Sequence, residues 1–189
     1  MPFDLHLRHG FFDAETCRTL VAEMRASPSG PALTYGKADS GLVDEKVRKV
    51  TRINPSLHTV ESVITRLSDY RPTIEAHFGI NLSACEEPQF LCYQTGDFFV
   101  AHQDGNTGLT RLATESRRVS VTIFLNRPAG ESEEESYSGG SLKFSEWRSG
   151  EEFTLAGETG MLVAFRSELT HEVLPVTQGE RYAIVSWYR

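Results

Sequence analysis

Short strand-like runs separated by turn residues fill the second half of the chain, and they restrict the fold more than any other feature. Between residues 119 and 125 every odd position is apolar, a period-two pattern that predicts a strand with one buried face. Many short strands of this kind favour a double-sheet β-sandwich or jelly roll with helices packed outside. The predicted strands are Gln89–Tyr93, Phe98–Gln103, Arg118–Asn126, Gly140–Phe144, Glu152–Leu155, Met161–Phe165, His171–Val176 and Arg181–Tyr188.

Two amphipathic helices are expected before these strands. Asp13 is a good N-cap, and apolar residues follow it at helical spacing up to a Pro- and Gly-rich stop at 28–31. A second helical stripe ends at Gly79, and Pro72 within it should kink or split the helix because it removes one backbone hydrogen bond. The stripes are Cys17, Leu20, Val21 and Met24, then Val60, Val63, Ile64 and Leu67, with Ile74 and Phe78 as a continuation.

The length of 189 residues allows one domain with a sizeable core and leaves little room for a second. We therefore expect a single domain over residues 1–189, of mainly β class with flanking helices (α+β). Residues 1–79 would form a helical support region, with a loop at 34–45 and a strand at 46–53. Residues 80–189 would form the β core.

Composition and charge favour a cytoplasmic protein, monomeric or homodimeric, without a nucleic-acid or membrane partner. The net charge is −7 and the pI is near 5.4, whereas binding to nucleic acid usually needs a basic face. We find no apolar run typical of a signal peptide, and no segment approaches the ~20 apolar residues of a membrane helix. Cys17, Cys85 and Cys92 are odd in number and form no C-x-x-C pair, so reduced thiols are expected rather than disulfides or zinc ligands.

A His-x-Asp pair lies at the end of the second predicted strand. The stretch from Tyr93 to Gly105 reads as strand, tight turn and strand. Side chains alternate faces along a strand, so His102 and Asp104 project on the same side, roughly 7 Å apart along the backbone. One imidazole and one carboxylate on one face are suited to a divalent metal, and a third ligand is still needed.

The third candidate ligand is His171, and a candidate anion-binding residue follows at Arg181. The runs that begin at these two residues read as a β-hairpin. If the turn of this hairpin is centred near Gln178, Arg181 lies opposite Pro175. Pro175 shares a strand face with His171 and lies roughly 13 Å from it along the strand. A metal and a guanidinium would then face one cavity. That gap suits a short dicarboxylic acid, because arginine binds a carboxylate through two parallel hydrogen bonds.

Two histidines and one carboxylate form the facial triad that leaves three positions open on octahedral Fe(II). Zinc with the same ligands and a water is the chemical alternative. Arg181 disfavours zinc, since a hydrolase has no evident need for this group.

The chain resembles the Fe(II)/2-oxoglutarate-dependent dioxygenases, and within them the prolyl-4-hydroxylase-like group. The resemblance covers about residues 87–189 and rests on an ordered set of motifs rather than on His-x-Asp alone. The matching pieces are Tyr93, Phe98–Asp104, Arg118–Asn126, Ser138–Phe144, Gly160–Ser167, His171–Val173 and Arg181.

The resemblance implies a double-stranded β-helix in which His102, Asp104 and His171 bind iron. Arg181 would meet the far carboxylate of 2-oxoglutarate, with Tyr93 as a second contact. Its cofactors and co-substrates would be Fe(II), 2-oxoglutarate and O₂, together with ascorbate. The implied reaction is hydroxylation of an unactivated C–H bond, with release of succinate and CO₂.

Several other residues have two readings. Thr122 and Trp187 could line the cavity, but core packing is the favoured reading. Arg166 could reach the substrate, although a structural salt bridge is favoured; Arg117 and Arg118 have no assigned use. By analogy the loop Thr34–Val50 would cover the substrate. The acidic run Glu131–Glu135 reads as a solvated loop, or else as a rim that attracts a cationic substrate.

Four functions remain open from the residues. The first is hydroxylation of a prolyl residue in a peptide or protein, and the second is oxygenation of a free amino acid or other small molecule. The third is a metal-binding jelly roll without turnover, and the fourth is a metal hydrolase. The complete set of iron and 2-oxoglutarate motifs counts against the last two, and nothing in the sequence separates the first two.

Overall fold

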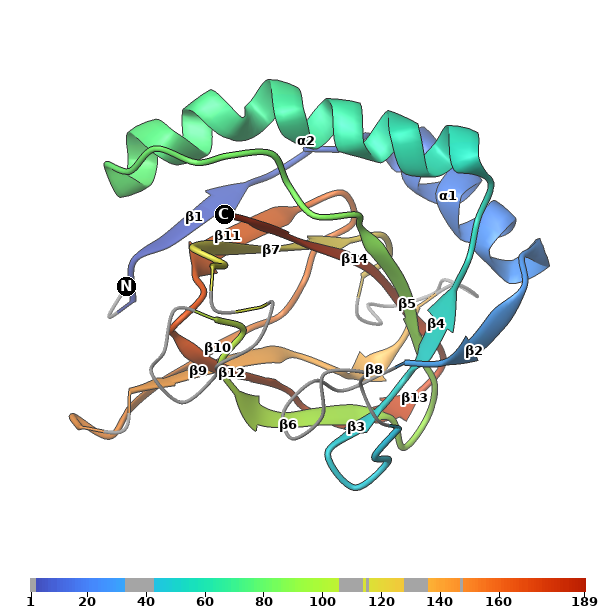
Figure 1. Cartoon of the computed structure of the whole chain (residues 1–189). Coiled ribbons are helices and arrows are strands. Elements are labelled where there is room, and N and C mark those ends of the chain that lie inside the picture. The colour runs from blue at the N-terminus through green and yellow to red at the C-terminus, as the bar shows by residue number, and fades with distance from the viewer. Residues whose placement is uncertain (1–2, 33–42, 106–113, 115, 128–135, 147) are drawn as a thin grey trace.

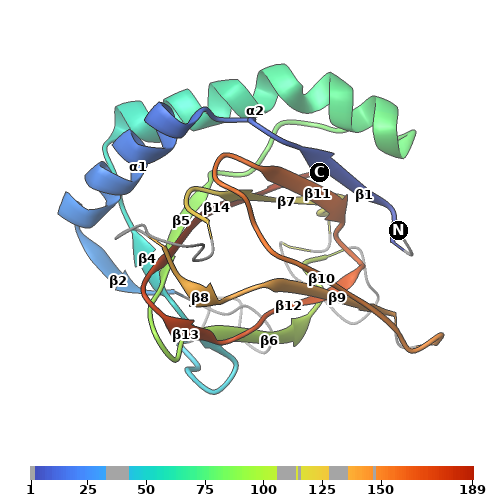
Figure 2. The same cartoon turned by 180° about the vertical axis from the view of Figure 1, so that it is seen from behind.

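Two antiparallel sheets lie face to face, and two helices cover the outer face of the larger sheet (Figure 1). The structure, a computed structural model, describes residues 3–32, 43–105, 114, 116–127, 136–146 and 148–189. The helices are α1 (Ala14–Ala26) and α2 (Leu57–Phe78). Viewed from behind, the same layers appear with the helices again outside the larger sheet (Figure 2). The predicted double-sheet architecture with outer helices is confirmed.

Within the described residues the larger sheet has seven strands and the facing sheet has five. In spatial order the seven are β1 (Leu5–Arg8), β11 (Leu162–Arg166), β7 (Val119–Phe124), β14 (Arg181–Tyr188), β5 (Gln89–Tyr93), β4 (Thr51–Ile53) and β2 (Ser29–Pro31). The five are β10 (Glu151–Leu155), β9 (Leu142–Glu146), β12 (Thr170–Val173), β6 (Phe98–His102) and β3 (Arg48–Lys49). A separate pair joins β13 (Val176–Gln178) to β8 (Ser138–Gly139).

Both predicted helices form, and a side chain near the end of α1 connects it to the start of α2. The Asp13 carboxylate accepts from the Thr16 N–H at the start of α1 (2.7 Å), and Ser56 caps α2 by accepting from the Thr59 N–H. Glu23 of α1 then accepts from the Ser56 N–H (2.8 Å) and from the Thr59 hydroxyl (2.6 Å). These bonds fix the start of α2 against α1.

Helix α2 runs through Pro72 without interruption, so the predicted split at this residue is wrong. Buried Ile74 and Phe78 pack the turns after the proline onto the larger sheet. One carbonyl of the turn before it, that of Leu67, accepts from the Tyr188 hydroxyl (2.7 Å). Packing on both sides of the proline thus outweighs the lost backbone bond. The helix ends at Gly79 in the left-handed conformation (φ 63°), as predicted.

Strand β7 is buried on both faces, so the predicted half-buried strand is wrong in that respect. All six of its residues are buried. Odd-numbered Val119, Val121 and Ile123 pack in the cluster shared with the helices, whereas Phe124 packs in the cluster between the sheets. Two apolar layers therefore enclose the central strands, and the space between the sheets is where a site can form.

The predicted strand at 46–53 divides between the two sheets. Its first part, β3, pairs with β6 of the smaller sheet, and after Val50 the chain continues as β4, which pairs with β5 of the larger sheet. Four short strands, β1, β2, β8 and β13, were not predicted, and β13 falls mostly on residues that were expected to form a turn. Most of the loop predicted at 34–45 and the acidic run Glu131–Glu135 lie outside the described residues.

The three cysteines are free, as predicted. Across the described ranges no helix has the length and apolarity needed to cross a membrane.

Candidate metal centre

Strand pairing brings the two distant histidines together. His102 of β6 and His171 of β12 are register partners on adjacent antiparallel strands, and their ring centroids lie 4.3 Å apart. The chain leaves β6 just after His102, which lets the Asp104 carboxylate turn between the rings. Its Oδ1 lies 3.5 Å from His102 Nε2, and its Oδ2 lies 3.3 Å from His171 Nε2. One ligand atom from each residue fits within 4.8 Å of the others, so the three can hold one metal ion.

Backbone carbonyls orient both imidazoles in the same way. The Nδ1 of His102 contacts the Val100 carbonyl oxygen (2.8 Å), and the Nδ1 of His171 contacts that of Leu169 (2.9 Å). A carbonyl can only accept, so each Nδ1 carries a proton, and each Nε2 faces Asp104 as the candidate ligand atom. This second contact fixes the tautomer in which Nε2 is the metal ligand.

The electrostatics of the cluster favour the ionised form of Asp104 and the neutral form of His102. Burial opposes ionisation of Asp104, but the charge of His171 and hydrogen bonds from both histidines outweigh it and hold the pKa of the carboxyl well below its usual range. Burial, followed by repulsion from His171, lowers the pKa of His102. A carboxylate and neutral imidazoles are the required ligand states.

A buried guanidinium lies in the same cavity as the triad. The cavity has a volume of about 160 Å³, and His102, Asp104, His171, Tyr93 and Arg181 all contribute to its lining. Arg181 is 1% exposed, and its Nε and Nη2 have no hydrogen-bond partner among the described residues. Its guanidinium carbon lies 5.1 Å from the ring centroid of Tyr93 and 5.0 Å from that of Phe124.

The route by which Arg181 reaches the cavity differs from the prediction. The predicted hairpin between the runs at His171 and Arg181 is wrong, because β12 belongs to the smaller sheet and β14 to the larger one. Arg181 pairs with Tyr93 of β5, not with Pro175. The two residues face one cavity because the sheets face each other.

Glycine at position 140 leaves room for this arginine. Gly140 has φ 62°, and a Cβ there would come within 2.9 Å of Arg181 Cδ and of Val176 Cγ2. Gly140 therefore has a packing role beside the buried guanidinium. The buried ring of Tyr137 lies close to the same position, and no sequence pattern pointed to this residue.

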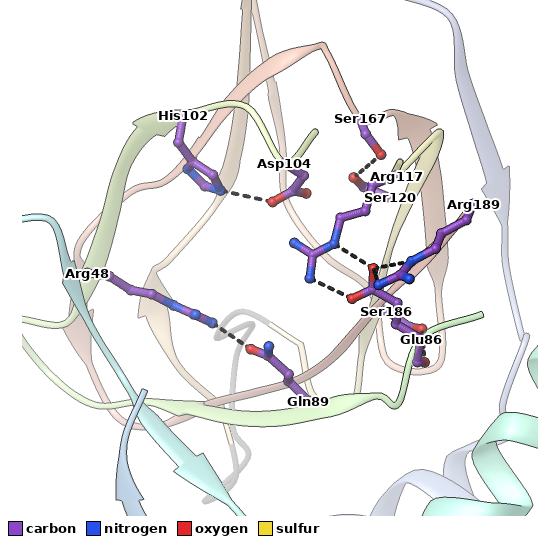
Figure 3. A network of polar contacts seen from close by, with 10 residues as sticks. All are labelled: Arg48, Glu86, Gln89, His102, Asp104, Arg117, Ser120, Ser167, Ser186 and Arg189. Carbon is purple, nitrogen blue, oxygen red and sulfur yellow. Dashed lines mark hydrogen bonds and ion pairs between the residues drawn. The ribbon is translucent and has the colours of Figure 1, made fainter. Parts of the chain in front are cut away.

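A polar network that was not predicted from the sequence lies beside the triad (Figure 3). Arg117 donates to Glu86 through Nε (2.9 Å) and Nη2 (2.6 Å), and its guanidinium carbon lies 3.7 Å from the ring centroid of Trp187. Arg117, Thr122 and Trp187 line the cavity, so core packing is not the only role of the last two. The partners are far apart in sequence, and no local motif predicts them.

A second arginine lies on the metal side of the cavity. Arg48 donates to the Gln89 side-chain oxygen (3.2 Å) and stacks on Phe99, whose ring in turn stacks on His102 at 3.5 Å. Arg166, in contrast, donates to the Phe78 carbonyl at the end of α2 (2.8 Å), an interaction of the structural kind but not the predicted salt bridge.

The residues present fit iron with a keto diacid. Two imidazoles and one carboxylate are the ligand set of non-haem Fe(II) oxygenases and leave coordination positions open. Leaving donors of a buried guanidinium unpaired is costly, so the open nitrogens of Arg181 call for an anion. A dicarboxylate that reaches from the metal to Arg181 would satisfy both.

Comparison with known proteins points the same way. Residues 88–189 match the family model described as the 2OG-Fe(II) oxygenase superfamily. A PKHD-type hydroxylase of Maricaulis maris is 31% identical over 160 residues, which cover 82% of this chain and 67% of the relative. A PKHD-type hydroxylase of Synechococcus is 34% identical over 96 residues, and the aligned part spans only 39% of that relative's length.

Solved structures share the whole fold. The crystal structure of a Pseudomonas putida prolyl-4-hydroxylase is 25% identical, with a TM-score of 0.75 over 99% of this chain and 93% of that one. A Trichoplax adhaerens prolyl hydroxylase in complex with a peptide fragment of a hypoxia inducible factor has a TM-score of 0.68 at 18% identity and supports the fold alone. All five predicted site residues fall inside the matched region, and the chain belongs to the 2OG-Fe(II) oxygenase superfamily.

Proposed function

We propose that the chain is an Fe(II)- and 2-oxoglutarate-dependent dioxygenase that hydroxylates a prolyl residue of a peptide or protein and releases succinate and CO₂. The observation that carries this proposal is the metal triad and the unpaired buried Arg181 in one cavity. When bound, the iron and its co-substrate supply the oxidising chemistry for the C–H bond.

The protein's own residues bind, orient and shield. His102, Asp104 and His171 would hold the metal on one side of the cavity, and Arg181 would bind the far carboxylate of 2-oxoglutarate. Tyr93 lies beneath this guanidinium and stays a proposed second contact. The C–H step needs no acid or base from the chain, so the part of the protein is to place the ligands and the substrate.

The wall formed by Arg117 suits a peptide carbonyl. Glu86 fixes the guanidinium through two nitrogens, and Trp187 supports its face. Among the described residues nothing bonds the third nitrogen, Nη1, which Figure 3 shows directed into the space beside the triad. Glu86 also binds Arg189 (3.0 Å), so its carboxylate is shared by two guanidiniums, and Nη1 is the nitrogen of Arg117 that is left to donate to a carbonyl oxygen of the substrate.

The prolyl substrate also draws support from the names of relatives, which are PKHD-type hydroxylases and prolyl hydroxylases. Oxygenation of a free amino acid or small molecule is the competing outcome. The predicted use of ascorbate, the cytoplasmic location and the monomeric or dimeric state stay predictions.

The test measures succinate from Fe(II), 2-oxoglutarate and oxygen with proline-containing peptides and with free amino acids. We expect peptides to stimulate turnover and Asp104→Ala to abolish it. Arg117→Gln should raise the KM for peptide by about tenfold or more, because a hydrogen bond from a charged group contributes about 1.5–3 kcal/mol. The KM for 2-oxoglutarate should not change.

Arg117→Lys is the matched control, since it keeps the charge but not the two-nitrogen contact with Glu86. Stimulation by free amino acids alone, with no effect of Arg117→Gln, would exclude the peptide substrate. Undiminished turnover of 2-oxoglutarate by Asp104→Ala would refute the metal centre itself.

A further inference from the structure

One serine connects the Asp104 loop to the segment that carries His171. The backbone carbonyl of Ser167 accepts from the N–H of Asp104 (2.9 Å) and from that of Gly105 (3.2 Å). Only a tight turn separates Ser167 from His171, closed by the Leu169 N–H on the Arg166 carbonyl (2.9 Å). The position of Ser167 therefore determines how the carboxylate ligand sits relative to the second histidine.

Ser167 is in turn anchored to strand β7. Its N–H donates to the Arg118 carbonyl (3.0 Å), and its Oγ lies 2.9 Å from the Oγ of Ser120. The two serines are 0% and 2% exposed, and Figure 3 shows the pair beside Asp104. Ser120 belongs to a central strand of the larger sheet, whereas His102 and His171 lie on the smaller one. Ser167 directly follows β11, the neighbour of β7, so the hydroxyl pair lies where the chain leaves the larger sheet for β12.

Packing alone does not require these hydroxyls. Each is the other's hydrogen-bond partner within the described residues, and two apolar side chains of similar size would fill the same space at little cost. On its far side the Asp104 loop is already tight, because a Cβ at Gly105 would collide with the Thr114 carbonyl and with Arg117. The hydroxyl pair limits movement on the remaining side.

We propose that the Ser120–Ser167 hydroxyl pair is a positioning device for the metal centre, which fixes Asp104 against His171 in the geometry that a single ion needs. This inference rests on the proposed function, since it presumes that the triad binds a metal. Metal–ligand distances tolerate only about 0.2 Å of error, so a small shift of the Ser167 carbonyl is enough to weaken binding.

The experiment measures Co(II) affinity of the metal-free protein by visible absorption, and stability by urea unfolding without metal. The variants are Ser120→Ala, Ser167→Ala and the double variant. Ser186→Ala is the matched control: its hydroxyl is equally buried and donates to the Glu86 carbonyl (2.8 Å), but it touches none of the segments that carry a ligand. Wild-type binding of Co(II) tests the metal centre separately from the serines.

We expect both single variants to weaken Co(II) binding by roughly tenfold, the lower end for partners that orient metal ligands. The control should lose stability but bind Co(II) within twofold of wild type. In the double variant no hydroxyl is left unpaired, so stability should recover while Co(II) binding stays weak. Affinity that recovers together with stability, or single variants that bind Co(II) like wild type, would overturn the proposal.

Discussion

Replacing Arg181 by methionine should stabilise the metal-free protein and abolish its response to 2-oxoglutarate. Two guanidinium nitrogens lack partners in the described structure, and each such buried donor costs about 1–3 kcal/mol, or about 2–6 kcal/mol together. The contacts with Tyr93 and Phe124 return about 0.5–2 kcal/mol each, or about 1–4 kcal/mol. The centres of these ranges differ by about 1.5 kcal/mol in favour of methionine.

For a chain of this length such a gain raises the unfolding midpoint by about 3–6 °C. The assay is thermal and urea unfolding of both proteins, first without ligands and then under anaerobic conditions with Co(II) and 2-oxoglutarate. At a concentration 100 times its dissociation constant, 2-oxoglutarate should stabilise the wild type by about 2.7 kcal/mol and leave Arg181→Met unchanged. Arg181→Lys controls for the retained charge.

A methionine variant that is less stable than wild type by more than about 1 kcal/mol would show that the guanidinium is satisfied in the folded protein. A variant that 2-oxoglutarate stabilises as strongly as wild type would place the anion site elsewhere. Either result refutes the reasoning from unpaired donors.

Three further predictions concern acid stability, cavity packing and thiol reactivity. Burial opposes ionisation of Glu86, but Arg117 outweighs it and lowers the pKa of this carboxyl below 4.5. Wild type should therefore have a higher free energy of unfolding than Glu86→Gln above about pH 5, and this difference should shrink as the pH falls through the folded pKa. Gly140→Ala should displace Arg181 and weaken 2-oxoglutarate binding while Co(II) affinity, measured by absorption, is retained. Burial raises the pKa of Cys92 to about 11, so mass spectrometry should find it unmodified by iodoacetamide in native protein at about pH 8 and modified in urea; early native modification would contradict its burial.

Local patterns predicted the elements, because their causes are local. The helical stripe and N-cap of α1, and the strand at Gln89–Tyr93, appear where the sequence places them. Sheet membership was not local. The tight turn after Tyr93 carries the chain from the larger sheet to the smaller one, and the Gly-containing run before Arg181 joins the separate β13–β8 pair to the larger sheet, so neither closes a hairpin. The hairpin that was expected to bring His171 and Arg181 onto one face is absent, and their common cavity arises from the stacking of two sheets.

The residues of the site also differ in whether a local sequence pattern identifies them. The proposed metal ligands His102 and Asp104 carry a motif with fixed spacing, so they could be proposed from the sequence. Arg117 could not be assigned from the sequence, because its partners Glu86 and Trp187 lie far away in the chain. They reach Arg117 only because the fold brings β14 and the segment before β5 together. The sequence contains the residues of this wall but no pattern that relates them.

The crossings between the sheets have a consequence for how the cavity is filled. Neighbouring strands β4, β5 and β14 leave the larger sheet at the same end, where Thr51 pairs with Cys92 and Arg181 with Tyr93. Chain segments that cross between the sheets close that end, and Arg181, the first residue of β14, lies there. On the proposed function we expect a diacid to pass the triad before it reaches Arg181, so a peptide bound beside the triad would block its entry.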